Sequence, residues 1–204
     1  VRGARQRRGE KMREIGIGIV GGGYMGKAHA VAMHAVGAVF NTALRPRLVM
    51  VAARSAETAE KYRVAYGCER GTGDWRELVA DPAVEAVVLA STQDTHRAVA
   101  EAAFARGLPV FCEKPLGTGL ADSRAMMAAA DAAGVVNIVG FNYVRTPATQ
   151  FARQLLESGR IGDVVWFRGE HTEDFYAGAD TPATWRAKGR TSGCMGDLAP
   201  HMIN

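Results

Sequence analysis

The sequence predicts an α/β fold, a doubly wound parallel sheet, followed by the truncated start of an α+β domain. Short apolar segments rich in β-branched residues alternate with longer helical segments from residue 15 onward, which is typical of βαβ units and a parallel sheet. The first apolar segment runs directly into a glycine-rich loop, and the first helical segment follows this loop. The alternation stops after Pro147, so we expect a different domain to begin there.

Six strands and the helices between them account for the first two thirds of the chain. The expected strands lie at 15–20, 47–53, 68–72, 84–90, 109–112 and 135–141. The expected helices lie at 25–36, 56–66, 74–79, 95–106 and 120–133. Asp74 is a candidate N-cap, and Gly107 and Gly134 are candidate C-caps. Residues 84–90 are apolar enough for a central strand that is buried on both faces.

Beyond the sheet, the sequence predicts only part of a second domain. A helix at 148–157, an extended segment at 164–173 and the start of a helix at 197–204 follow Pro147. One strand and a flanking helix cannot form a stable sheet alone, so we expect the chain to be a fragment. The expected division is a disordered basic extension at 1–11, a dinucleotide-binding domain at 12–145, and an incomplete C-terminal substrate and oligomerisation domain at 146–204.

Composition excludes several classes of protein. The first thirteen residues contain six basic residues and one acidic residue, so they carry a net +5 while the rest of the chain carries −1. This basic tail is not followed by a basic stripe with interleaved aromatics, and we expect no nucleic-acid partner. No stretch approaches the roughly 18 apolar residues of a membrane helix. Cys68, Cys112 and Cys194 are widely spaced, which predicts reduced thiols in a cytoplasmic protein and neither disulfides nor a metal site.

The glycine loop carries the first functional signal. Its sequence, Gly21-Gly22-Gly23-Tyr24-Met25-Gly26, satisfies G-x-G-x-x-G between a predicted strand and a predicted helix, as in Rossmann dinucleotide-binding folds. Gly21 would make the tight turn, Gly23 would let the backbone approach a pyrophosphate, and Gly26 would let helix and sheet pack closely. Tyr24 and Met25 complete the set of candidate cofactor contacts. The alternative is a glycine-rich turn that binds nothing.

The end of the second strand bears on the choice between NAD and NADP. The sequence there reads Ala52-Ala53-Arg54-Ser55, without the carboxylate that accepts hydrogen bonds from the ribose in NAD-specific sites. Arg54 can pair with a ribose 2′-phosphate and Ser55 can donate to it, which favours NADP over NAD. If Arg54 is instead solvated or stacked on adenine, NAD is acceptable.

Three further segments carry a family resemblance. Glu113-Lys114-Pro115 ends the fifth strand, Gly140-Phe141-Asn142-Tyr143 leaves the sixth, and Gly193-x-x-Gly196-Asp197-x-x-x-His201 lies near the end of the sequence. With the glycine loop, these motifs resemble the Gfo/Idh/MocA family of oxidoreductases in order from residue 21 to residue 201, including its inositol dehydrogenase and levoglucosan dehydrogenase-like members. The resemblance implies an NAD(P)-dependent dehydrogenase of carbohydrate metabolism. Such an enzyme transfers a hydride between a hydroxyl-bearing carbon of a sugar or polyol and a nicotinamide ring, and it works as a homodimer or tetramer.

The candidate catalytic residues are Lys114, Asp197 and His201. Asp197 and His201 are four residues apart, so on one helix they would share a face, and the carboxylate could orient the imidazole that accepts the hydroxyl proton. Lys114 would stabilise the developing alkoxide. The alternatives are an ordinary surface pair and a structural lysine paired with Glu113. Pro115 is a candidate for a cis peptide bond.

The resemblance also implies ligand contacts. The implied cofactor contacts are Thr92, Asp94, His96, Glu113, Lys114 and Asn142. The implied substrate contacts are Lys114, Tyr143, Asp197 and His201, with Arg145, Trp185 and Arg186 as further pocket candidates. His96 could equally be a structural residue at a helix start, and His29, His34 and His171 are expected to be structural or solvated. The rival functions are a non-catalytic dinucleotide-binding regulator on the same fold and an inactive gene fragment.

Overall fold

The computed structural model describes residues 12–174, 177–182 and 193–203. The expected basic extension, the pocket candidates Trp185 and Arg186, and Asn204 lie outside the described residues. Within the described ranges, no helix is long and apolar enough to cross a membrane. The same part of the chain contains no cluster of three or more His, Cys, Asp or Glu side chains that could hold a metal ion.

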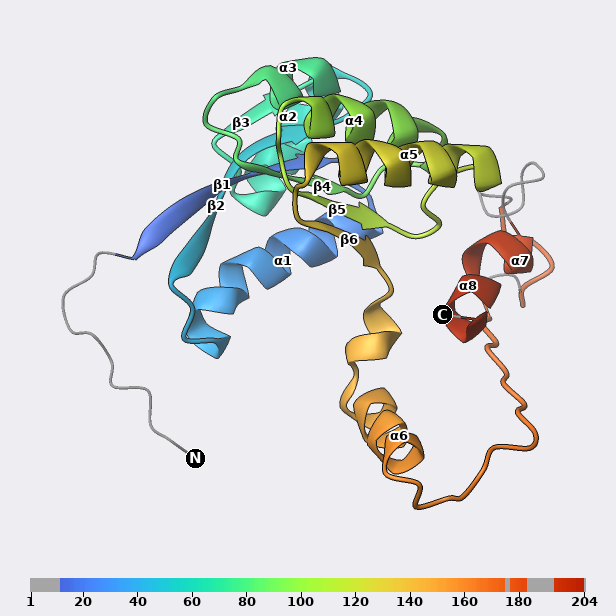
Figure 1. Cartoon of the computed structure of the whole chain (residues 1–204). Helices are drawn as coiled ribbons and strands as arrows, with labels where there is room; N and C mark the ends of the chain where they lie inside the picture. The colour runs from blue at the N-terminus through green and yellow to red at the C-terminus, as the bar shows by residue number, and fades with distance from the viewer. Residues whose placement is uncertain (1–11, 175–176, 183–192, 204) are drawn as a thin grey trace.

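A six-stranded sheet forms the centre of the molecule (Figure 1). The strands are β1 (Arg13–Val20), β2 (Leu44–Ala52), β3 (Arg70–Thr72), β4 (Ala86–Leu89), β5 (Val110–Glu113) and β6 (Asn137–Gly140). All neighbours pair in parallel in the order β3-β2-β1-β4-β5-β6. This order confirms the doubly wound Rossmann sheet. The chain reverses direction across the sheet between β1 and β4, and such a switch point is where open α/β sheets bind their ligands.

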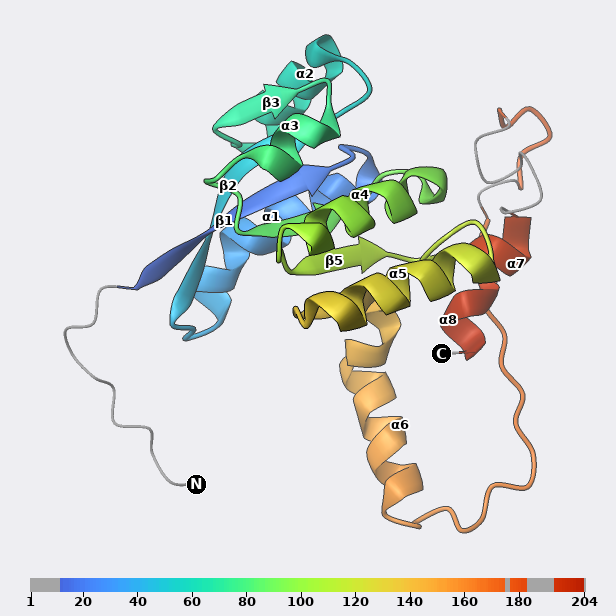
Figure 2. The ribbon, with the colours of Figure 1, turned by 45° about the horizontal axis from the view of Figure 1, so that its top comes forward.

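Helices cover both faces of the sheet (Figures 1 and 2). The helices are α1 (Tyr24–Val39), α2 (Ala56–Tyr66), α3 (Trp75–Ala80), α4 (Gln93–Ala105) and α5 (Leu120–Ala133). One buried cluster joins the sheet to α1 and α2 through side chains such as Ile19, Ala30 and Tyr66. A larger cluster joins the opposite face to α3, α4 and α5 through side chains such as Leu78, Val99 and Met126. Burial of these apolar surfaces supplies the main stabilisation of the domain.

The largest differences from the predicted bounds of the sheet and its helices lie at the end of α1 and the start of β2. Helix α1 continues to Val39, and β2 begins at Leu44, because Leu44 and Arg45 already pair with the start of β1. Pro46 therefore lies inside β2, although proline lacks the N–H that a ladder uses. It is tolerated because β3 pairs with β2 only from Met50 onward, so one edge of β2 is free of a partner strand at Pro46.

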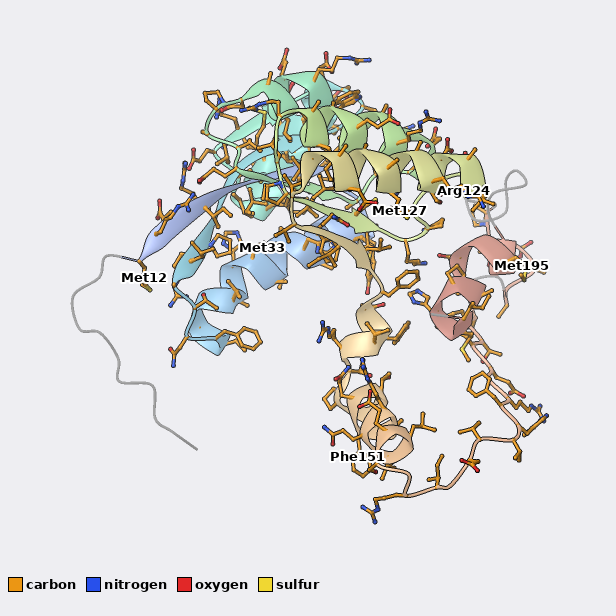
Figure 3. The ribbon with its side chains drawn as sticks, viewed as in Figure 1. Met12, Met33, Arg124, Met127, Phe151 and Met195 are labelled. Atoms are coloured by element: carbon orange, nitrogen blue, oxygen red, sulfur yellow. The ribbon has the colours of Figure 1, made fainter. Side chains whose placement is uncertain are left out.

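The chain then leaves the sheet and returns to it. The 3-10 helix η1 (Asn142–Arg145) and helix α6 (Pro147–Glu157) extend away from the sheet, and α7 (Gly193–Asp197) and α8 (Ala199–Ile203) come back beside it (Figure 1). Residues 164–174 form no ladder with any described strand. Phe151 on α6 and Met195 on α7 are 58% and 71% exposed (Figure 3). The apolar surface of this part of the chain is therefore only partly covered within the described residues.

The C-terminal helix of the sequence prediction is divided in two. The prediction that Asp197 and His201 share one face of a continuous helix is wrong, because α7 ends at Asp197 and α8 begins at Ala199. Pro200 explains the division, since proline fits the first turn of a helix but not its interior. The backbone N–H of His201 donates to the carbonyl of Leu198 at 3.0 Å, which closes the first turn of α8.

Candidate functional site

Gly21 and Gly26 of the glycine loop lie too close to neighbouring backbone atoms to carry a side chain. Gly21 has φ +96°, a left-handed conformation, and a Cβ there would lie 2.4 Å from the backbone nitrogen of Ser91. A Cβ on Gly26 would lie 2.2 Å from the carbonyl oxygen of Gly21. The Tyr66 hydroxyl donates to the carbonyl of Gly22. These contacts join the loops after β1 and β4 at the switch point of the sheet.

Gly23 has the opposite environment. A Cβ on Gly23 would meet no described atom within 4 Å, and its φ of −73° suits any residue. Packing within the described chain therefore does not require glycine here. Gly23 is also the N-cap of α1, whose first turn contains no acidic residue, so its N–H groups and its positive dipole end are open to an anion. A dinucleotide pyrophosphate fits these features.

The end of β2 offers an exposed cation. Arg54 is exposed, and Ser55 caps α2 by accepting a hydrogen bond from the backbone N–H of Thr58 at 3.2 Å. The Ser55 hydroxyl also donates to Oγ1 of Thr58 at 2.9 Å. The predicted role of Ser55 as a donor to a phosphate therefore competes with its role as a helix cap.

The three polar candidates after β4, which are Thr92, Asp94 and His96, differ in exposure. Thr92 and Asp94 are exposed around the start of α4, where a ligand can reach them. His96 is 1% exposed, and its two ring nitrogens lie 3.1 Å from the carbonyl oxygen of Ser91 and 3.2 Å from that of Pro115. Burial lowers the pKa of His96. The structure thus gives His96 the contacts of a structural residue, which was the second interpretation of this histidine.

Two separate polar contacts form at the end of β5. Glu113 accepts from Nε2 of His29 on α1 at 2.8 Å, whereas Nζ of Lys114 donates to Asp197 Oδ1 at 2.6 Å and to its carbonyl oxygen at 2.8 Å. The alternative in which Lys114 pairs with Glu113 is therefore wrong. The bond between Lys114 and Pro115 is cis, as predicted. The Lys114–Asp197 pair is largely buried, with 14% and 8% of the two side chains exposed.

His201 lies among aromatic rings beside this pair. Its ring centroid is 4.7 Å from that of Tyr143 and 6.2 Å from that of Phe141, both edge-on, and 5.5 Å from the stacked ring of His171. Its Nδ1 is buried and, among the described residues, lacks a hydrogen-bond partner. Burial lowers the pKa of His201, and the charge of Lys114 lowers it further. Both causes favour the neutral imidazole, the form that is able to accept a proton.

The structure therefore gathers Lys114, Asp197, His201 and Tyr143 at one place, while the glycine loop forms a second, anion-accepting place at the same edge of the sheet. Asn142, on η1, is exposed near the first group. Sequence reasoning missed two histidines that belong here, His29 and His171. A lone histidine carries little signal, but His29 lies three residues after Gly26, on the helix whose N-terminus faces the site.

An apolar groove of about 500 Å³ lies elsewhere, between α5 and the strands β5 and β6. Arg124 and Met127 of α5 are among its lining residues (Figure 3). None of the candidate site residues lines it. The groove is therefore separate from the polar groups described above.

Comparisons with known proteins agree with this arrangement. Residues 15–141 match the family model described as "Oxidoreductase family, NAD-binding Rossmann fold", and residues 149–204 match the "GFO/IDH/MocA C-terminal domain". Levoglucosan dehydrogenase from Pseudarthrobacter phenanthrenivorans is 38% identical over 95% of this chain and 50% of its own length. Inositol 2-dehydrogenase from Rhizobium meliloti is 34% identical over 74% of this chain and 43% of its own length. The chain thus spans about half the length of the curated relatives it matches.

Solved structures show the same similarity. A levoglucosan dehydrogenase in complex with NADH and levoglucosan is 35% identical, with a TM-score of 0.88 over 94% of this chain and 52% of that one. An NAD binding oxidoreductase from Klebsiella pneumoniae is 37% identical, with a TM-score of 0.84 over 93% of this chain and 51% of that one. The similarity therefore covers both the sheet and the C-terminal segments that hold Asp197 and His201.

Proposed function

Since this chain belongs to the Gfo/Idh/MocA family of oxidoreductases, we propose that it carries the nicotinamide-binding and proton-transfer machinery of a dehydrogenase that acts on a sugar or polyol hydroxyl. The observation that carries the proposal is the buried Nδ1 of His201, which has no hydrogen-bond partner among the described residues and lies beside the buried Lys114–Asp197 pair. A neutral histidine next to a fixed ammonium can take a hydroxyl proton while the ammonium stabilises the alkoxide.

The glycine loop supports a bound dinucleotide. Gly23 leaves open the space that a pyrophosphate would fill, and the N-terminus of α1 presents N–H donors to it. Thr92 and Asp94 lie beside the same switch point. When bound, NAD(H) would supply the hydride acceptor or donor. Arg54 is exposed and close in sequence to β2, where it could pair with a ribose 2′-phosphate. This residue favours NADP over NAD as the cofactor.

Each residue of the catalytic group then has a distinct task. Lys114 would bind the substrate hydroxyl oxygen and stabilise it as the proton leaves for His201. Asp197, which accepts from Lys114 through both its side chain and its backbone, would fix the ammonium in place. Its negative charge also opposes the lowering of the His201 pKa. Tyr143, in edge-on contact with His201, would line the substrate pocket.

Purified protein tests the proposal with a panel of polyols and anhydrosugars in the presence of NAD or NADP. We expect dinucleotide reduction, followed by its ultraviolet absorbance, and loss of that activity in His201→Ala. Dinucleotide binding without turnover on any substrate would favour the non-catalytic regulator. Failure to bind either dinucleotide would refute the proposal as a whole.

A further inference from the structure

His29 and Glu113 form a buried contact that links the two halves of the site. Nε2 of His29 lies 2.8 Å from Oε1 of Glu113, and the two side chains are 14% and 7% exposed. His29 is on α1, and Glu113 is the last residue of β5, directly before Lys114. A buried carboxylate is costly unless it has a hydrogen-bond partner, so His29 determines where this carboxylate can rest.

The surroundings leave the pair little freedom. The His29 ring meets Phe111 edge-on, with centroids 4.8 Å apart. On the other side, a Cβ at Gly140 would lie 3.0 Å from Oε1 of Glu113. The carboxylate is thus confined between α1 and β6. Since β5 ends at Glu113, strand alternation does not hold the Lys114 side chain on the other face of the sheet. The contact with His29 instead draws Glu113 toward α1 and leaves Lys114 free to reach Asp197.

We infer that His29 is a positioning residue that fixes the cofactor helix α1 to the turn that carries Lys114. The inference rests on the proposed function, in which the N-terminus of α1 holds the dinucleotide and Lys114 holds the reacting oxygen. Without the imidazole, the Glu113 carboxylate has the adjacent ammonium of Lys114 as an alternative partner. Lys114 would then be shared between two carboxylates, and its amine would no longer be held at one position.

A second histidine on the same helix provides a matched control. Nε2 of His34 lies 2.8 Å from the carbonyl oxygen of Tyr66. This contact also joins α1 to another element, but His34 is exposed and its partner is an uncharged backbone group far from Lys114 in sequence. Replacing His34 tests the loss of a histidine from α1, whereas replacing His29 also releases a buried carboxylate.

Measurements of kcat distinguish a positioning role of His29 from a role in stability alone. We expect His29→Leu to lower kcat at saturating substrate and dinucleotide about tenfold or more, since small misplacements of reacting groups cost up to about a hundredfold. The dinucleotide Kd should stay within about threefold, because the glycine loop is unchanged. His29→Gln keeps a side-chain N–H that can donate to Glu113 and should restore kcat to within about threefold. His34→Leu should lower the melting temperature and leave kcat unchanged.

Acylation of Lys114, followed by mass spectrometry of the protein without dinucleotide, tests the same contact without turnover. An amine that is bonded to two carboxylates is less accessible to the reagent than one that is bonded to Asp197 alone, so we expect labelling of Lys114 in His29→Leu to be about threefold slower or more than in His34→Leu. The double variant His29→Leu/Glu113→Gln should recover the labelling rate. Unchanged kcat or unchanged labelling in His29→Leu would overturn the inference, as would His29→Gln behaving like His29→Leu. A wild-type protein without turnover would refute the proposed function alone, and the labelling rates would still decide the role of His29.

Discussion

Two glycines of one loop should respond to the same substitution in opposite ways. Gly21→Ala places a methyl group on a residue with φ +96°, which costs about 1–2 kcal/mol. That methyl also lies 2.4 Å from a backbone nitrogen, and relieving such an overlap costs about 1–3 kcal/mol. The sum of about 2–5 kcal/mol corresponds to a fall in melting temperature of about 4–20 °C for a chain of this size.

Gly23→Ala, by contrast, meets open space at a φ of −73°. It should leave stability unchanged or raise it by about 0.4–1 kcal/mol, because alanine restricts the unfolded chain. If a pyrophosphate approaches this backbone, the methyl group removes at least one hydrogen bond to a charged group, worth about 1.5–3 kcal/mol. The dinucleotide Kd should therefore rise about ten- to hundredfold.

Thermal melts and NADH fluorescence titrations of the two variants measure both effects on the same samples. Gly21→Ala should lose stability, and Gly23→Ala should lose affinity alone. Equal NADH affinity in wild type and Gly23→Ala would refute the assignment of this loop to the pyrophosphate. A Gly21→Ala variant as stable as the wild type would refute the reasoning from backbone geometry.

Four further substitutions test other parts of the site. Lys114→Met should lower kcat about a hundred- to a thousandfold, and retained kcat would exclude the ammonium from the reaction. Arg54→Ala should raise the Kd of NADP about tenfold and leave that of NAD nearly unchanged, whereas equal changes would argue against a 2′-phosphate contact. After burial and the charge of Lys114, His171 is the next cause that lowers the pKa of His201. His171→Phe should therefore raise that pKa and move the acid limb of the pH–kcat profile upward, and an unmoved limb would contradict this. Burial lowers the pKa of His96, so a proton binds this histidine better in the unfolded chain than in the folded one. The free energy of unfolding should therefore fall as pH drops below about 6.5. A flatter dependence of the melting temperature on pH in His96→Gln is the check.

The sequence predicted the sheet because its determinants are local. Alternating strand and helix segments, the glycine loop and Gly134 as the C-cap of α5 each depend on neighbouring residues. Boundaries were less certain where a tertiary contact overrides a local preference. Pro46 illustrates this, because a proline is compatible with a strand whose other edge is unpaired, and the length of β3 could not be known from β2.

The charge partners could not be predicted in the same way. Glu113 pairs with His29 from 84 residues away, and Lys114 pairs with Asp197 from 83 residues away. A spacing of four residues pointed to Asp197 and His201 as a helical pair, but that logic requires one continuous helix, which Pro200 interrupts.

The position of Lys114 connects the fold of the C-terminal segments to their chemistry. Its bonds to the side chain and carbonyl of Asp197 hold the end of α7 at the edge of the sheet, and α8 with His201 follows directly. The same ammonium lowers the pKa of His201. In the proposed reaction, removing this charge would act on the alkoxide, on the basicity of His201 and on its location at once, so the effects of replacing Lys114 and His201 should not be additive. His29 completes this dependence from the other face of β5, because it keeps Glu113 from competing for the ammonium on which the other contacts rely.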